Sequence, residues 1–166
     1  AHHRTAVFRM LTLRSHYRSP IDFGPDQIEQ AEAAIARIND FYFRARSGSA
    51  NQGSFDIDEL PPRIREDIDS YREAFTSAMD DDFNSPAALA VVFEAIKTAN
   101  HEIDSGGAQQ IGAAYASLVR ELLASVGLDL ESSSQQRSDD KTELPDRLVE
   151  AVLELREALR AAKLFD

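Results

Sequence analysis

The stretch Ala78-Met79-Asp80-Asp81-Asp82-Phe83-Asn84-Ser85-Pro86 lies between two long segments in which apolar residues recur at helical spacing. It predicts a tight junction between two helices. Ser85 followed by Pro86 is a helix-start signal, because a Ser hydroxyl can accept a hydrogen bond from an early backbone N–H and Pro at the first helical position lacks a donor that would have no partner there. We therefore expect a helix to begin near residue 86, with Phe83 turned inward as a plug between the two helices.

Three consecutive carboxylates, Asp80, Asp81 and Asp82, precede this helix start, where the positive end of the helix dipole favours anions. An oxygen-rich cluster also suits Mg²⁺ or Ca²⁺, but a calcium loop alternates its ligands and has a Gly at its sharp turn, and neither feature is present here. The favoured hypothesis is a capping and partner-pairing role. The alternatives are metal-binding or catalytic carboxylates and a merely solvated turn.

On both sides of this junction, apolar residues recur three and four positions apart, which indicates amphipathic helices. These helices are separated by Pro and Gly residues that end or interrupt a helix, at Ser19-Pro20, Gly24-Pro25, Gly106-Gly107 and Gly127. Helices are expected over 4–15, 24–46, 61–78, 86–104, 108–126 and from 145 onward. Loops of flexible composition are expected over 47–60 and 128–143. With no sustained period-2 pattern, the sequence predicts an all-α fold, an antiparallel bundle of about five to six helices.

The apolar stripes of these segments also predict which residues form the core. The predicted core set is Val7, Phe8, Met10, Leu11, Leu13, Ile28, Ala31, Ile35, Ile38, Tyr42, Ala45, Ile64, Ile68, Tyr71, Phe75, Ala78, Leu89, Val92, Phe93, Ile96, Ile103, Ile111, Tyr115, Leu118 and Leu122, with Leu148, Val152, Leu155 and Leu159 on the last segment.

Composition narrows the class of protein. The chain has 166 residues, enough for one domain with a sizeable core. No cysteine is present, which excludes disulfides and thiolate metal sites, and no apolar run approaches the roughly 20 residues needed to cross a bilayer. These features are typical of a cytoplasmic protein. Because the first residue is Ala and the helical pattern continues to Asp166, we expect this chain to be a piece of a longer one. We expect the piece by itself to be monomeric.

The charge balance limits how this chain could meet a nucleic acid. Its formal net charge is −11, which opposes non-specific attraction to phosphates, so any such contact requires a local basic patch. The basic residues are 15 Arg and only 3 Lys. Two groups of them could meet a phosphate backbone: Arg4, Arg9, Arg14 and Arg18 near the start of the chain, and Arg156, Arg160 and Lys163 near its end.

Each basic group has a second interpretation. The group near the end is spaced i, i+4, i+7 on one helix face, a pattern that also fits a solvated surface. For Arg14 and Arg18, pairing with Asp81 or Asp82 is favoured over nucleic-acid contact. His16 and Tyr17 lie beside Arg18 at a helix end, so we expect them to form a structural junction with the stretch Asp80, Asp81, Asp82, Phe83, Asn84 and Ser85.

The search for catalytic motifs is negative. The sequence has no Gly-rich phosphate loop, no His-Glu-x-x-His, no Gly-x-Ser-x-Gly and no Glu-x-x-His pair of the kind that builds a di-iron bundle. We therefore expect no catalytic residue and no metal site within this chain.

Three blocks of the sequence resemble one known family. They are Phe8-Arg9-Met10-Leu11-Thr12-Leu13-Arg14-Ser15-His16-Tyr17-Arg18-Ser19-Pro20-Ile21-Asp22-Phe23, then Phe75-x-x-Ala78-Met79-Asp80-Asp81-Asp82-Phe83-Asn84-Ser85-Pro86-x-Ala88-Leu89-Ala90, and the final helix 155–166, in which Leu159 stands where an Ala is usual. Together they are similar to the cysteinyl-tRNA synthetases.

This resemblance implies a fold, a partner and a division of labour. Residues 1–23 would be the end of the stem-contact region, with the first helix and turn, and residues 24–166 the DALR-type helical bundle that follows a class I catalytic domain. The implied partners are tRNA(Cys) and that catalytic domain. The family's ATP-binding signatures and zinc-binding cysteines have no counterpart here, so the resemblance assigns ATP and zinc to the catalytic domain and no cofactor to this chain.

Two alternatives remain open from the sequence. The cysteine ligase of mycothiol synthesis is a sister family that shares the bundle and a similar acidic turn. A non-catalytic helical module that binds a protein partner through a groove is the alternative from another class.

Overall fold

The computed structural model describes residues 2–46, 60–128 and 130, with side chains from Thr5 onward. All of them belong to the first of two compact units, residues 1–130. Most of the two expected loops and the helix expected from residue 145 lie outside the described residues. The same holds for Arg156, Arg160 and Lys163, and for the side chain of Arg4.

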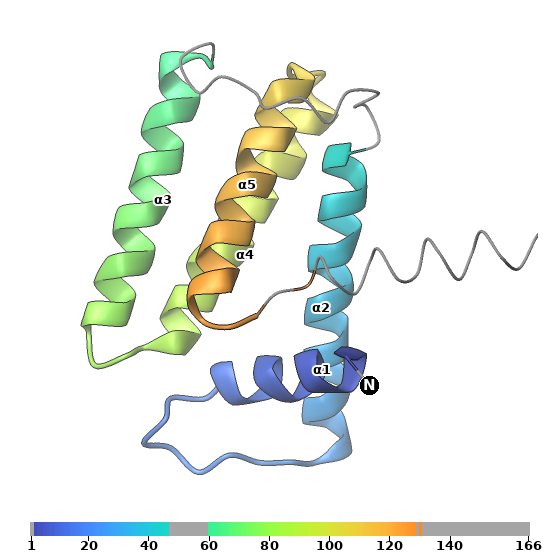
Figure 1. Cartoon of the computed structure of the whole chain (residues 1–166), viewed down its shortest axis with the longest axis vertical. Coiled ribbons are helices and arrows are strands. Elements are labelled where there is room, and N and C mark those ends of the chain that lie inside the picture. Colours follow the sequence, from blue (N-terminus) through green and yellow to red (C-terminus); the bar gives the residue numbers. More distant parts are fainter. Residues whose placement is uncertain (1, 47–59, 129, 131–166) are drawn as a thin grey trace, which may run out of the picture. The chain divides into compact units, whose positions relative to one another are not determined.

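All regular secondary structure in the described part of the chain is α-helical, which confirms the expected fold class. Its helices are α1 (His2–Leu13), α2 (Pro25–Arg46), α3 (Pro62–Asp80), α4 (Ser85–Asp104) and α5 (Gln109–Ser125). Figure 1 shows α2 to α5 running alternately up and down as an antiparallel bundle, while α1 lies across the end at which α2 begins. The helix α1 packs mainly on α2, and the other close pairs are α3 with α4 and α4 with α5.

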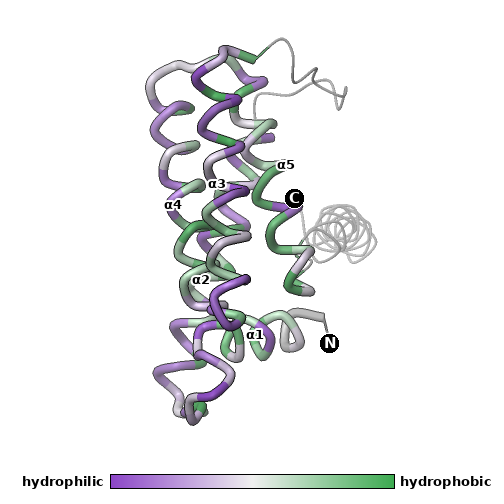
Figure 2. Tube along the Cα trace, turned by 90° about the vertical axis from the view of Figure 1, so that its left-hand side faces the viewer, coloured by the Kyte–Doolittle hydropathy of each residue, from purple (hydrophilic) through white to green (hydrophobic). Residues whose placement is uncertain are grey.

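Most of the predicted core is buried, and α5 contributes the most buried residues among the described helices. In Figure 2 the trace of α5 is largely green and white, in keeping with its central place. Two predicted core residues are wrong, because Phe8 is 56% exposed and Ile28 is 41% exposed. Both lie on the edge of their helix's apolar stripe, where periodicity alone does not decide which side is covered.

The sequence pattern missed several buried residues, and Phe41, Leu60, Leu128 and Leu130 are among the large ones. Phe41 is adjacent to Tyr42 on α2 and falls off the simple stripe, yet it is fully buried. Leu60, Leu128 and Leu130 lie inside segments whose composition predicts loops, and all three are buried in the same core. A loop residue carries no periodic signal, so only the packing of the bundle ends reveals it.

Glycine ends two helices as the sequence predicts. Gly106 follows α4 and Gly127 follows α5, with φ values of 76° and 75°. At each end, the N–H of the Gly and that of the next residue donate back to the last turn, for example from Leu128 N to the carbonyl of Leu123 at 2.8 Å. This pair of bonds needs a left-handed residue, which Gly adopts without steric cost.

Polar pairs at the helix surfaces hold neighbouring helices in register. Arg63 of α3 donates two hydrogen bonds of 3.0 Å to the carboxylate of Glu102 on α4. Arg72 of α3 contacts Glu121 of α5 in a similar fork. Burial, followed by the charge of Asp67, raises the pKa of the fully buried Tyr115, whose hydroxyl lies 3.4 Å from Asp67 Oδ2.

None of the helices described here is both long and apolar enough to cross a membrane.

Candidate nucleic-acid interface

The acidic stretch forms the turn between α3 and α4, and its backbone decides where its side chains point. Asp82 and Phe83 both have a φ of 53°, in the left-handed region that non-glycine residues rarely adopt. This turn directs the Phe83 side chain outward, where it is 67% exposed. The expectation that Phe83 plugs the core is therefore wrong.

Asn84, not Ser85, caps α4. The Asn84 side-chain oxygen accepts from the N–H of Ala87 at 3.2 Å, and α4 already begins at Ser85. The expected Ser85 cap is one residue too late, because Pro86 occupies the second helical position and not the first. Asn and Ser are nearly equivalent caps, so the sequence alone could not rank them.

The Asp82 carboxylate contacts the side chains of three residues that follow the end of α1. The Tyr17 hydroxyl donates to Asp82 Oδ1 at 2.7 Å, and Arg18 Nη1 lies 2.8 Å from Asp82 Oδ2. His16 Nε2 is 3.9 Å from the same carboxylate. The predicted pairing of Arg18 with this acidic turn is present, and the hydrogen bond to Asp82 raises the pKa of Tyr17.

Aromatic rings surround this junction on its outer side. His16 stacks on Tyr17 with ring centroids 4.9 Å apart, Phe83 meets Tyr17 edge-on at 6.5 Å, and the Arg18 guanidinium carbon lies 5.3 Å from the Tyr17 ring centroid. Beside them is a mostly apolar hollow of about 330 Å³ that reaches Leu13. The junction therefore combines a satisfied carboxylate with an exposed aromatic surface.

The other arginines near the start of the chain have different partners. Arg14 does not pair with Asp81 or Asp82, contrary to the favoured expectation, but donates through Nη2 to Gln30 Oε1 of α2 at 2.6 Å. It leaves the end of α1 toward α2, because α1 packs across that helix. Arg9 Nη1 donates to the carbonyl of Gly127 at 2.6 Å, which ties α1 to the end of α5.

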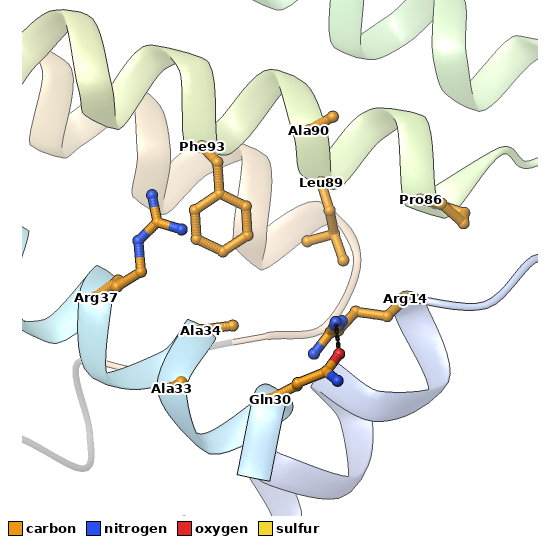
Figure 3. Close-up of a pocket in the computed structure, with 9 residues that line it drawn as sticks. All are labelled: Arg14, Gln30, Ala33, Ala34, Arg37, Pro86, Leu89, Ala90 and Phe93. Carbon is orange, nitrogen blue, oxygen red and sulfur yellow. Dashed lines mark hydrogen bonds between the residues drawn. The ribbon is translucent and has the colours of Figure 1, made fainter. Parts of the chain in front are cut away.

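Arg14 also lines a groove of about 410 Å³ between α2 and α4, which we call the α2–α4 groove (Figure 3). A second arginine, Arg37 of α2, points across it, with its guanidinium carbon 5.0 Å from the centroid of the Phe93 ring. Sequence reasoning did not select Arg37. The spacing of Gln30, Ala33, Ala34 and Arg37 on one helix face was the available signal.

The described residues form no cluster suited to a metal ion. Within the described residues, no group of three or more His, Cys, Asp or Glu side chains is placed to hold an ion. The sequence has no cysteine either. The zinc that the family resemblance implies for a catalytic domain therefore has no ligand set in this part of the chain.

Comparison with known protein families gives one domain match. Residues 74–131 match the DALR domain, a range that includes the end of α3, the acidic turn, α4 and α5. The acidic turn is thus inside the region that carries the family signature.

Comparison with individual proteins extends the similarity to nearly the whole chain. The chain is 33% identical over 161 residues to the cysteine–tRNA ligase of Pseudothermotoga lettingae, a match that covers 96% of this chain and 32% of that protein. It is 35% identical over 166 residues to the cysteine–tRNA ligase of Magnetococcus marinus, covering 95% of this chain and 33% of that protein. The chain thus spans about a third of the length of these relatives.

Proposed function

We propose that this chain, which carries a DALR domain match and is similar along nearly its whole length to part of cysteine–tRNA ligases, is the tRNA-binding helical region of such an enzyme. The observation that carries the proposal is the extent of the match. It covers 96% of the chain, so it includes α1 and its exit as well as the DALR segment.

The surface chemistry supports this proposal. Arg14 and Arg37 are exposed residues near the exit of α1 and on the adjacent face of α2, and neither pairs with a carboxylate among the described residues. Guanidinium groups suit phosphate oxygens because their planar fork can donate two parallel hydrogen bonds. In a chain of net charge −11, such a local concentration is the kind of patch that contact with RNA requires.

The role within the parent enzyme follows the same proposal. Residues 1–23 would be the end of the stem-contact region, with the first helix and turn, and residues 24–166 would be the DALR-type bundle that supports tRNA(Cys) beside the catalytic domain in the cytoplasm. The chain itself would be non-catalytic and would hold no cofactor. Activation of cysteine with ATP, and the zinc of the family, would belong to the catalytic domain.

A binding titration tests the proposal. Fluorescently labelled tRNA(Cys) is titrated with the chain at two KCl concentrations, and the anisotropy is followed. We expect weak binding that weakens further with salt, because each protein–phosphate contact releases a condensed counterion. If no salt-sensitive binding is found at high micromolar protein, the helical protein-interaction module becomes the better interpretation.

A further inference from the structure

We infer that the α2–α4 groove is a binding site for the phosphate backbone of RNA, with Arg14 and Arg37 as its two contact residues. This inference rests on the proposed function and assigns one of its contact sites. Four observations carry it: the charge inside the groove, the spacing of its cations, the apolar wall between them, and the occupied face of Phe93.

The two arginines of the groove differ from the other arginines in their partners. Arg14 donates to the neutral amide of Gln30, and Arg37 lies over an aromatic ring, so neither has a carboxylate partner among the described residues. By contrast, Arg18, Arg44, Arg63 and Arg72 each pair with an Asp or Glu. No Asp or Glu lines the groove. It is therefore a positively charged site in a strongly acidic chain.

The spacing of the two cations fits an extended anion. Gln30, which holds Arg14, and Arg37 are seven residues apart on α2, a rise of about 10 Å at 1.5 Å per residue. Ala33 and Ala34 lie between them with small side chains, so a ligand backbone can approach the helix (Figure 3). Pro86 brings the first turn of α4, the positive end of its dipole, to the same groove.

The side chains on the α4 side of the groove favour contact with the phosphate backbone of RNA over stacking with its bases. Leu89 and Phe93 of α4 form its apolar side, whose side chains offer no hydrogen-bond acceptor to compete with an anion for the two guanidinium groups. The face of the Phe93 ring is already covered by Arg37, so it is not open for a base. A sequence-independent contact with phosphate groups is what this arrangement offers.

Paired substitutions in the full chain test the inference. The variants are Arg14→Gln and Arg37→Gln, and the matched control is Arg120→Gln, which removes the same charge from an exposed position on α5 outside the groove. Labelled tRNA(Cys) binding is measured at several KCl concentrations. We expect each groove variant to weaken binding on the order of fivefold to tenfold, and to reduce the slope of log affinity against log salt by about 1. The control should change neither.

Folding is separated from binding by a conservative variant and by melting curves. Arg37→Lys keeps the positive charge but lacks the planar guanidinium that can donate two parallel hydrogen bonds. We therefore expect it to keep the slope of log affinity against log salt and to lose only part of the affinity. If Arg37→Gln binds more weakly but melts like the wild type, and Arg37→Lys keeps the salt slope and part of the affinity, the loss reflects charge in an intact fold and supports the inference. If both variants melt normally and bind like the wild type, the inference is wrong.

The remaining outcomes separate this inference from the proposed function. If the wild type binds tRNA and the control loses as much affinity as the groove variants, the groove is not the contact, although the proposed function stands. If the wild type does not bind tRNA, the proposed function fails and the inference fails with it. If labelled polyglutamate binds Arg37→Gln more weakly than the wild type while tRNA binds both equally, the groove takes an acidic peptide, which also overturns the inference.

Discussion

Among the described residues, Asp82 and Phe83 are the two non-glycine residues with a positive φ. A left-handed conformation costs a non-glycine residue on the order of 1–2 kcal/mol, and both residues have a φ of 53°. Asp82 is held there by two strong partners, the Tyr17 hydroxyl and the Arg18 guanidinium. The Phe83 ring meets Tyr17 edge-on, and the Phe83 N–H donates to the carbonyl of Met79 at 3.0 Å, so the hydrogen-bonded turn holds its conformation.

Replacing Phe83 with Gly distinguishes an exposed turn residue from a core plug. Gly adopts a positive φ freely, which offsets the lost contact with Tyr17, so we expect the free energy of unfolding to stay within about 1 kcal/mol of the wild type. A core plug would instead cost about 3–5 kcal/mol on truncation. Urea denaturation followed by circular dichroism measures the difference. The matched control is Phe41→Ala at a fully buried position, where we expect the larger loss.

At the scale of the elements, the start of α4 depends on a single side chain. Asn84 satisfies one of the early backbone N–H groups of α4, and the Ser85 side chain has no capping bond. The helix then packs on both α3 and α5, so fraying at its first turn disturbs two interfaces.

A pair of alanine substitutions tests which residue caps α4. We expect Asn84→Ala to lower the free energy of unfolding by about 1 kcal/mol, because it leaves the N–H of Ala87 without its acceptor. Ser85→Ala should stay within about 0.5 kcal/mol of the wild type, since no cap bond is lost. Thermal or urea melts of both variants decide it, and a larger loss from Ser85→Ala would contradict the assignment.

At the scale of the whole molecule, ion pairs between helices link stability to pH. The hydrogen bonds from Arg63 lower the pKa of Glu102. A depressed pKa in the folded state means that this contribution to stability is present above the unfolded value of about 4.3 and is lost as the pH falls through the folded pKa. Acid should therefore weaken the contact between α3 and α4.

Removing the charge of Glu102 should reduce this pH dependence. We expect Glu102→Gln to be less stable than the wild type at neutral pH. Between about pH 7 and pH 3 it should lose less stability than the wild type does, because the carboxyl group with the lowered pKa is no longer there to be protonated. Urea melts at both pH values measure the difference. Glu94→Gln is the control, since Glu94 pairs only with the exposed Lys97 in a neighbouring turn. Equal pH dependence in wild type and Glu102→Gln would show that the pair contributes nothing to acid sensitivity.

Much of the helical fold could be predicted from local signals. Apolar periodicity located α2 and α5, and Gly106 and Gly127 marked the ends of α4 and α5, because these signals act within one or two turns of a helix. The candidate site was predicted less completely. Arg18 was matched to the acidic turn, but Arg14 was matched to the wrong partner and Arg37 was not selected.

The sequence by itself determined the all-α class, the approximate positions of α1 to α5 and the family resemblance, because these depend on residues close together in the chain. Only the tertiary structure decided that Phe83 points outward, that Asn84 caps α4, and that Arg14 and Arg37 share a groove. The physical reason is that such outcomes depend on how α1 crosses α2 and how the turn between α3 and α4 bends. Contacts between residues distant in the chain set both, and no local pattern records them.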